Sequence, residues 1–252
     1  MTRALRCLGV TAVLVLLAGL LGVGPASAGE TDPDPLAGAP AVGACYDLTL
    51  KQAYGHSSPK PAVECTGDET MFVTAVGEVP ASFDWADVNW KKFPAAMSRK
   101  LTTTCDPATK KLLGTPTRRA LTLWDSYWFA PNKREIAAGA RWFSCSVALT
   151  SSTKLLDLPA AGPAKITGSI PDAVARCAKA VKGGFAAVAC SASHQYRTTF
   201  SKVVRGKATD KSVLKAANRT CPRHVVSREW LYRTSWVTRT TFVLACSNKT
   251  RH

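Results

Sequence analysis

The sequence lacks the short motifs that mark common catalytic and metal sites. Its 252 residues contain no G-x-S-x-G, no H-E-x-x-H and no C-x-x-C, and only four histidines. None of these histidines has a serine, cysteine or carboxylate at a spacing that marks a catalytic pair. We therefore expect a protein that is not an enzyme and that uses no metal ion and no cofactor.

Long apolar runs are also absent, apart from one at the start of the chain. Arg3 and Arg6 precede an apolar stretch over residues 7–23, which is followed by A-S-A ending at residue 28. A positive start, a short apolar stretch and an A-x-A exit are typical of a secretory signal peptide. The alternative is an uncleaved anchor, for which the stretch is short because a bilayer core is about 30 Å thick. We expect a signal peptide over 1–28 and a secreted, extracellular mature chain that begins at Gly29 without a transmembrane span.

Acidic residues are scarce in the last part of the chain. Residues 29–168 contain 15 Lys and Arg against 14 Asp and Glu, whereas residues 169–252 contain 16 against 3, a net charge of +13. Such asymmetry is typical of a region that meets a polyanion. Outside a cell the polyanions are wall polymers, anionic lipid headgroups and stray nucleic acid. The alternative is that the charge serves only solubility.

Cysteine, by contrast, is plentiful. Eight cysteines follow the signal peptide, and an even number in an exported chain favours a disulfide framework. They form two sets of four, and their spacings are too wide for a zinc knuckle or ribbon. In each set the first pair would join the opening segment to its neighbouring strand, and the second pair would tie a helix end to the final strand. The expected bridges are Cys45–Cys65, Cys105–Cys145, Cys177–Cys190 and Cys221–Cys246.

Composition divides the mature chain into two related units. The divisions are a disordered leader rich in Pro, Gly, Ala and Asp over 29–42, a first unit over 43–149, a linker over 150–168 and a basic second unit over 169–252. We expect an α+β fold in which each disulfide-stapled unit is a small antiparallel sheet with a packed helix.

Periodicity predicts similar elements in the two units. In the first unit, alternation over 142–149 predicts a strand with Cys145 facing the core, and apolar residues at helical spacing predict a helix over 93–104. Further strands of this unit are expected at 62–65, 71–79 and 119–129. In the second unit, a helix over 171–182 ended by Gly183 is expected. It is followed by strands at 185–190, 195–205, 229–237 and 240–246, with a helix capped by Asp210 before the last two.

Three short motifs carry a resemblance to a known family. The chain reads G-A-C at 43–45, G-A-R-W-F-S-C at 139–145 and C-S-A-S-H at 190–194. It resembles the septum-formation family of exported actinobacterial proteins, whose pattern runs G-x-C, V-x-C-x-x-P-H and G-x-R-W-x-x-C. The chain departs from this pattern at Glu69, which replaces the histidine of the first unit, and the second unit lacks the G-x-R-W element. The resemblance implies tandem copies, the second divergent, and a link to cell division or the envelope; it implies no catalytic chemistry.

Strand alternation indicates which side chains of the second unit are exposed. Trp230, Tyr232 and Trp236 share one face of their strand, whereas Arg233 and Arg239 point to the other. A core role for the aromatic residues is therefore favoured over a stacking platform for single-stranded nucleic acid. We expect a basic binding face formed by Arg197, Arg205, Arg233 and Arg239.

His194 is the one candidate for a chemical role, as a histidine beside a disulfide-bonded strand that could contact a ligand or a metal ion. The simpler interpretation is that its ring hydrogen-bonds a nearby backbone carbonyl.

These observations lead to one main functional hypothesis and one alternative. The main hypothesis is a secreted, non-enzymatic cell-envelope binding protein whose basic second unit contacts anionic wall polymers or lipid headgroups. Its first unit would contact an envelope protein partner, and no specific nucleic acid is expected. The alternative is a small exported hydrolase that uses His194 with an acid brought near by folding.

Overall fold

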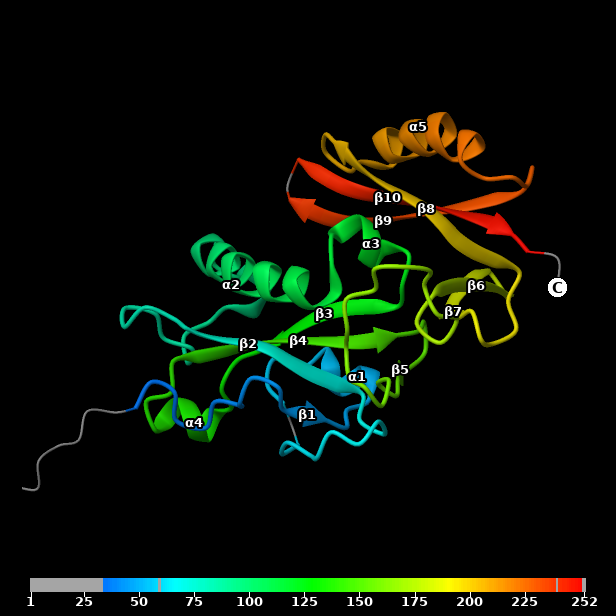
Figure 1. Cartoon of the computed structure of the whole chain (residues 1–252). Coiled ribbons are helices and arrows are strands. Elements are labelled where there is room, and N and C mark those ends of the chain that lie inside the picture. Colours follow the sequence, from blue (N-terminus) through cyan, green and yellow to red (C-terminus); the bar gives the residue numbers. More distant parts are fainter. Residues whose placement is uncertain (1–33, 59, 239, 251–252) are drawn as a thin grey trace, which may run out of the picture. The chain divides into compact units, whose positions relative to one another are not determined.

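The computed structural model describes residues 34–58, 60–238 and 240–250 (Figure 1). The expected signal peptide, its cleavage site and the first residues of the leader lie outside the described residues. All the residues that are described belong to one compact unit.

The first half of the chain builds an antiparallel sheet, sheet one, with the strand order β1-β2-β4-β3. A short fifth strand, β5, pairs with β4. The strands are β1 (Cys45–Tyr46), β2 (Met71–Glu78), β3 (Trp124–Phe129), β4 (Trp142–Thr150) and β5 (Leu155–Leu156). The helices of this half are α1 (Leu50–Ala53), α2 (Ala95–Leu113), α3 (Pro116–Ala120) and α4 (Lys133–Ala137), with a 3-10 turn at Trp90–Lys92.

The second half builds sheet two, which is also antiparallel and has the order β7-β6-β8-β10-β9 (Figure 1). Its strands are β6 (Arg176–Val181), β7 (Gly184–Ala189), β8 (Tyr196–Arg205), β9 (Trp230–Thr238) and β10 (Thr241–Lys249). One helix, α5 (Asp210–Thr220), is followed by a 3-10 turn at Cys221–Arg223. The predicted α+β class, with a small antiparallel sheet and a packed helix in each half, is confirmed.

The two halves share an order of elements. In each, a strand is followed by the main helix and then by two more strands, and the sheet order is β2-β4-β3 in the first half and β8-β10-β9 in the second. This shared order supports the prediction of tandem copies, which stays a prediction.

The four disulfides connect the expected partners. Cys45 bonds Cys65, Cys105 bonds Cys145, Cys177 bonds Cys190, and Cys221 bonds Cys246. The pairing prediction is confirmed, including the ties from α2 to β4 and from the end of α5 to β10. Such a framework fits an exported protein. No helix in the described part of the chain combines the length and the apolar character needed to cross a membrane.

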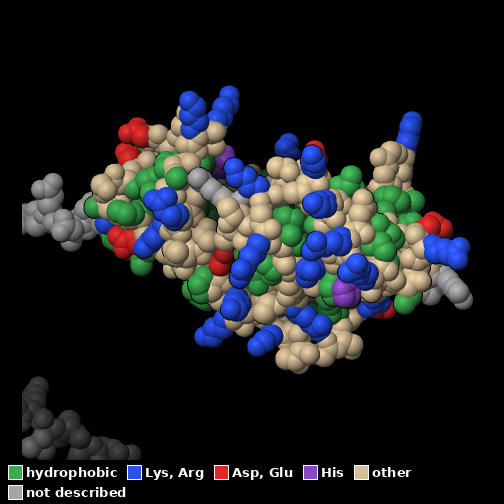
Figure 2. All heavy atoms as spheres, turned by 90° about the horizontal axis from the view of Figure 1, so that it is seen from above, with side chains coloured by type: hydrophobic (Ala, Val, Ile, Leu, Met, Phe, Trp, Pro, Cys, Tyr) green, Lys and Arg blue, Asp and Glu red, His purple; other side chains and the backbone are tan. Residues whose placement is uncertain are grey.

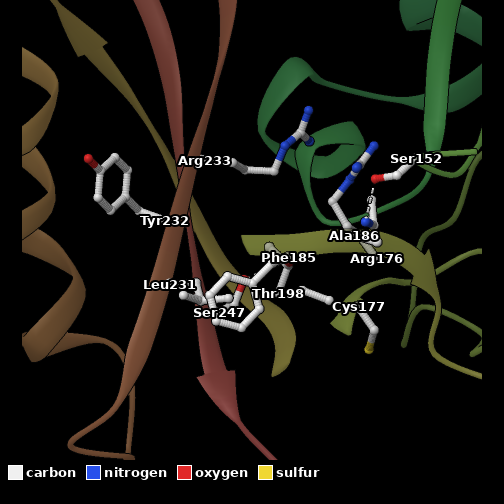
Figure 3. Close-up of a pocket in the computed structure, with 12 residues that line it drawn as sticks. Ser152, Arg176, Cys177, Phe185, Ala186, Thr198, Leu231, Tyr232, Arg233 and Ser247 are labelled. Carbon is white, nitrogen blue, oxygen red and sulfur yellow. Dashed lines mark hydrogen bonds between the residues drawn. The ribbon is translucent and has the colours of Figure 1, made fainter. Parts of the chain in front are cut away.

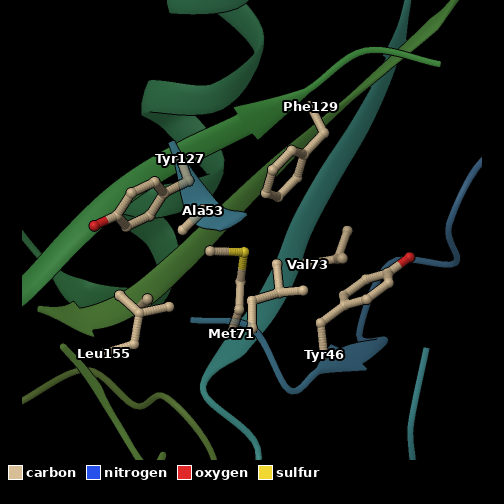
Figure 4. Packing of buried hydrophobic residues seen from close by; sticks show 9 residues of the cluster. Tyr46, Ala53, Met71, Val73, Tyr127, Phe129 and Leu155 are labelled. Carbon is tan, nitrogen blue, oxygen red and sulfur yellow. The ribbon is translucent and has the colours of Figure 1, made fainter. Parts of the chain in front are cut away.

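The core of sheet one lies on both of its faces. On one face, side chains from β1, β2 and β3 converge around Met71, which is fully buried (Figure 4). On the other, Met97 and Leu101 of α2 pack against Phe143 of β4. Because β4 is central and covered on both sides, Ser144 is buried as deeply as its apolar neighbours. The alternation along this strand therefore marks two core faces rather than a core face and a solvent face.

The expected helix over 171–182 is wrong. Residues 176–181 form β6, which turns through Lys182 and Gly183 into β7. Gly183 has a φ of +85°, so the glycine expected to stop a helix makes a tight hairpin turn instead. The pairing of β6 with β7 places Cys177 opposite Val188, which brings Cys177 close to its disulfide partner Cys190.

Smaller differences concern the ends of elements. The helix expected over 93–104 runs from 95 to 113 as α2, and the strand expected at 62–65 is reduced to a single bridge between Cys45 and Val63. The expected strand over 119–129 begins only at Trp124, after α3. The N-cap of α5 is Thr209 rather than Asp210, because the Thr209 hydroxyl accepts the Ser212 amide hydrogen.

Two segments that composition predicted to be unstructured are attached to sheet one. In the leader, the Arg141 amide donates to the Pro35 carbonyl (2.7 Å), and Trp142 Nε1 donates to the Ala37 carbonyl (3.0 Å). In the predicted linker, β5 pairs with β4, and the buried Leu158 donates its amide hydrogen to the carbonyl of Glu69 (2.8 Å). Both segments differ from the prediction because the sheet supplies the apolar contacts and backbone partners that they cannot supply alone.

The two sheets meet at a junction segment, residues 117–123. Ala120 packs on Val243 and Ala245 of β10, and Ser201 Oγ of β8 donates to the Thr117 carbonyl (2.6 Å). Backbone hydrogen bonds also join this segment to residues 174–176. The face of sheet two that points away from α5 is therefore covered by the first half of the chain.

Candidate anion-binding site

The outer face of α5 carries a basic stripe, defined here as Lys211, Lys215 and Arg219. The three residues are spaced four apart, so they lie on one side of the helix. Ala217 and Cys221 face the opposite way and are buried against sheet two. The stripe is consequently exposed. Figure 2 shows Lys and Arg side chains gathered over this side of the molecule, with few Asp and Glu among them.

The acidic residues of this half do little to neutralise the stripe. Asp172 forms an ion pair with Arg197 (2.6 Å), and Glu229 forms one with Lys249 (2.8 Å). The hydrogen bond and charge of Lys249 lower the pKa of Glu229. The third acidic residue, Asp210, lies in the first turn of α5, where a carboxylate is favoured by the helix dipole. Two of the three carboxylates are thus already engaged with cations outside the stripe.

The expected basic face is only partly formed by the residues that alternation selected. Arg205 is exposed at the end of β8. Arg197 is half-buried, because its guanidinium pairs with Asp172 and also donates to the Ile170 carbonyl (3.2 Å). Arg239 lies outside the described residues.

Arg233 also differs from the predicted exposed basic face, but for another reason. It does point away from Tyr232 and α5, as alternation required (Figure 3). That side is not solvent, however, because the junction segment covers it, and the Arg233 side chain is half-buried. The prediction that the aromatic residues belong to the core is confirmed for Trp230 and wrong for Tyr232. Trp230 packs against the core under α5, whereas Tyr232 is 41% exposed, and the Trp236 side chain lies outside the described part.

Arg233 lines a cavity of about 230 Å³, called here the arginine cavity. The other polar residues around it are Ser152, Arg176, Thr198 and Ser247. Arg176 and Arg233 come from β6 and β9, and both side chains extend toward the end of the cavity where Ser152 lies (Figure 3). On the other side of Arg233, a smaller cavity of about 180 Å³ also contains Arg119 and Asp125.

Burial disfavours the charge on each of the three arginines. Burial and, to a smaller extent, the nearby Arg233 charge lower the pKa of Arg176 to about 9, although Asp125 and Tyr127 act in the opposite direction. Burial also lowers the pKa of Arg233, opposed by Asp125, and that of Arg119, opposed by Asp106 and Asp125. All three guanidiniums remain protonated at neutral pH, so the fold holds a group of poorly solvated positive charges at the junction of the sheets.

His194 occupies the position that the simpler interpretation predicted. Its Nδ1 lies 2.7 Å from the carbonyl oxygen of Ala192. The sulfurs of Cys177 and Cys190 lie close to the ring, but they are bonded to each other and therefore supply no thiolate to a metal. The hydrolase alternative gains no support from this geometry.

Glu69 takes the corresponding place beside the Cys45–Cys65 disulfide. It is buried, and its Oε2 accepts hydrogen bonds from the amides of Thr66 (2.9 Å) and Gly67 (2.8 Å). The residue that replaces the family histidine therefore closes a turn of the chain.

Sequence reasoning selected Arg233 but missed the basic stripe and Arg176. The stripe could have been found, because Lys211, Lys215 and Arg219 show their fourfold spacing in the sequence. Arg176 could not have been found, because the apolar spacing around it predicts a helix and nothing in the nearby sequence indicates that it lies close to Arg233.

Comparison with known proteins gives one result. A family model described as septum formation matches residues 43–241, from just before β1 to the first residue of β10. No curated protein and no solved structure matches the chain.

Proposed function

The chain belongs to the septum-formation family, and on that basis we propose that it is a secreted, non-enzymatic cell-envelope protein that binds anionic wall polymers or lipid headgroups. The basic stripe on α5 is the observation that supports this proposal. It places three cations on one exposed face, while Asp172 and Glu229 are engaged elsewhere. The family match supports a septum-related role; the anionic ligand and the absence of catalysis are the parts that we propose.

The spacing of the stripe suits a repeating anion. Four residues of α-helix rise about 6 Å, so neighbouring cations of the stripe lie within the Debye length of about 8 Å at physiological ionic strength. Charges at this separation reinforce one another, whereas dispersed surface charges are screened individually. Each contact with a polymer phosphate releases a condensed counterion, which makes the affinity depend steeply on salt. For three contacts, raising salt from 50 to 200 mM should weaken binding on the order of 30-fold.

The test uses the full mature protein with phosphate-rich wall polymer and with vesicles that contain phosphatidylglycerol. Changing Lys211, Lys215 and Arg219 together to glutamine should reduce binding at least tenfold at low salt. The control changes Lys91, Lys92 and Arg99, which are exposed in the first half, to glutamine and removes the same charge. If both triple variants lose the same affinity, the stripe is not the binding site, and if binding ignores salt, the charge serves only solubility; either result rejects the proposal.

The first half remains the side on which we expect an envelope protein partner. The observation that supports this expectation is a group of stacked aromatic rings at its surface, including His56 on Trp90 with ring centroids 3.8 Å apart. Aromatic side chains are enriched at protein interfaces.

A further inference from the structure

The arginine cavity holds two guanidiniums that the protein itself does not satisfy. Arg176 donates its Nε hydrogen to the Thr122 carbonyl (2.8 Å), which fixes the base of its guanidinium. In the described part of the chain, neither Arg176 nor Arg233 forms an ion pair, and Arg233 forms no hydrogen bond. The terminal nitrogens of Arg176 and the whole guanidinium of Arg233 are therefore available as donors to the cavity (Figure 3).

Two guanidiniums without an ion-pair partner are costly at this site. Arg176 is only 8% exposed, and a poorly solvated cation without a counter-ion opposes folding unless another group compensates its charge. Asp125 acts on Arg119, Arg176 and Arg233 through its charge, but it lies beyond ion-pair distance of all three. Asp106 also acts on Arg119, so three cations and two carboxylates leave a local charge of +1. A lysine could lose its proton in this situation, whereas arginine keeps its charge, so an external anion is the remaining means of neutralisation.

We propose that the arginine cavity binds one dianionic phosphate group, either inorganic phosphate or the phosphate of a small monoester. A phosphate monoester carries a charge of about −1.5 to −2 at neutral pH, which matches the two guanidiniums that line the cavity. Its three free oxygens accept more hydrogen bonds than a carboxylate does, and guanidiniums bind them in pairs. The hydroxyl of Ser152 lies at the same end, where its oxygen accepts the Ala187 amide (2.7 Å) and its proton is free to be donated. At about 230 Å³ the cavity is below the usual range of roughly 300 to 1,000 Å³ for drug-sized ligands, which favours a small ion or ester.

This site is separate from the stripe, which lies on the other face of sheet two. The two can be tested independently, because the stripe should bind extended polymer through salt-sensitive attraction. The arginine cavity should bind a single small phosphate and should be less affected by salt, since partly buried charges are screened less.

Isothermal titration of the full mature protein with inorganic phosphate tests the proposal. Arg233→Gln should weaken binding about 10- to 100-fold, since a charged hydrogen-bonding partner is lost. Arg99→Gln removes the same charge at an exposed position of α2, away from the cavity, and should leave phosphate affinity unchanged. Arg233→Lys keeps the charge without the paired donors and should fall between the two. The proposal is overturned if the wild type binds no phosphate, or if Arg233→Gln and Arg99→Gln bind it equally.

Further measurements identify the source of the phosphate and guard against misfolding. Glycerol phosphate that competes with inorganic phosphate would identify a monoester ligand, whereas binding only to phosphatidylglycerol vesicles would overturn the cavity proposal. Arg176→Gln loses the bond to Thr122 and could unfold, so Arg233→Gln is the decisive variant. Without phosphate, Arg233→Gln should melt at a higher temperature than the wild type, and phosphate should raise the wild-type melting temperature only. The glutamine triple variant of the stripe should bind phosphate normally; a loss there would assign phosphate to the stripe and reject the cavity.

Discussion

Replacing Glu69 with glutamine should destabilise the protein at neutral pH but much less at acidic pH. The carboxylate is 3% exposed, and one of its oxygens accepts the amide hydrogens of both Thr66 and Gly67. A glutamine has nearly the same shape and can still present one oxygen to these amides. The substitution therefore removes the charge and leaves the packing close to unchanged.

The size of the effect follows from the two hydrogen bonds. A bond to a charged group contributes about 1.5 to 3 kcal/mol, compared with about 0.5 to 1.5 kcal/mol for a neutral one. Losing the charge from two such bonds should cost about 2 kcal/mol at pH 7. Burial acts to raise the pKa of Glu69, but the hydrogen bonds from the backbone amides of residues 66–69 outweigh it and leave the pKa lowered.

The lowered pKa sets the sign of the pH dependence. The folded state holds the proton of Glu69 less tightly than the unfolded chain, whose glutamates titrate near pH 4.3. The stabilisation by Glu69 is therefore complete above that value and disappears as the pH falls through the folded-state pKa. The difference between wild type and Glu69→Gln should shrink accordingly.

Urea unfolding at pH 7 and at pH 3, with the disulfides intact, measures this difference directly. The control is Glu64→Gln, an exposed glutamate in the same loop, which should change the free energy of unfolding by less than about 0.5 kcal/mol at either pH. If Glu69→Gln is equally destabilising at both pH values, the loss comes from packing. If it matches Glu64→Gln at pH 7, the amide bonds contribute nothing measurable. Either result refutes the reasoning.

Two further predictions concern the stability of the fold. Changing Cys105 and Cys145 to alanine removes a disulfide with a sequence separation of 40 and should lower the free energy of unfolding by about 4 kcal/mol. The same change at Cys177 and Cys190, whose separation is 13, should lower it by about 3 kcal/mol. Chemical unfolding without reductant compares them, and the reverse order would contradict the chain-entropy argument. Gly77→Ala would place a Cβ in steric clash with Cζ of the fully buried Phe143, and should lower the free energy of unfolding by about 1 to 3 kcal/mol, as measured by thermal unfolding. Adding Phe143→Leu should make the double variant more stable than the sum of the single changes predicts, and simple additivity would argue against the clash.

Much of the fold was predictable because its strongest signals are local. The alternation in β4 and the helical spacing in α5 identify both elements, and the cysteines sit at their ends or on their inner faces. Strand and helix directions then restrict which sulfurs can meet, so the disulfide pairing followed. Boundaries were less accurate, because α2 continues nine residues past the expected end through Pro107.

β6 shows where local signals fail. Residues 171–182 carry apolar side chains at helical spacing, but the same residues also fit a strand. Pairing with β7 and the bond from Cys177 to Cys190 decide between the two conformations, and both depend on residues later in the chain. The intrinsic preference for helix over strand amounts to less than about 1 kcal/mol per residue, which tertiary contacts of this kind readily exceed.

Arg233 shows the limit for functional residues. Alternation along β9 correctly separates its side chain from that of Tyr232, yet whether the opposite face is wet or covered depends on the junction segment, which belongs to the other half of the chain. The net charge of +13 therefore combines cations in two different environments. Cations on α5 keep their water, which suits the proposed attraction to a distant polyanion, whereas Arg176 and Arg233 lose much of theirs, which suits the proposed binding of one small anion. Under these two proposals the same residue type would act over long range in one place and as a short-range donor in the other, because folding sets the dielectric around each.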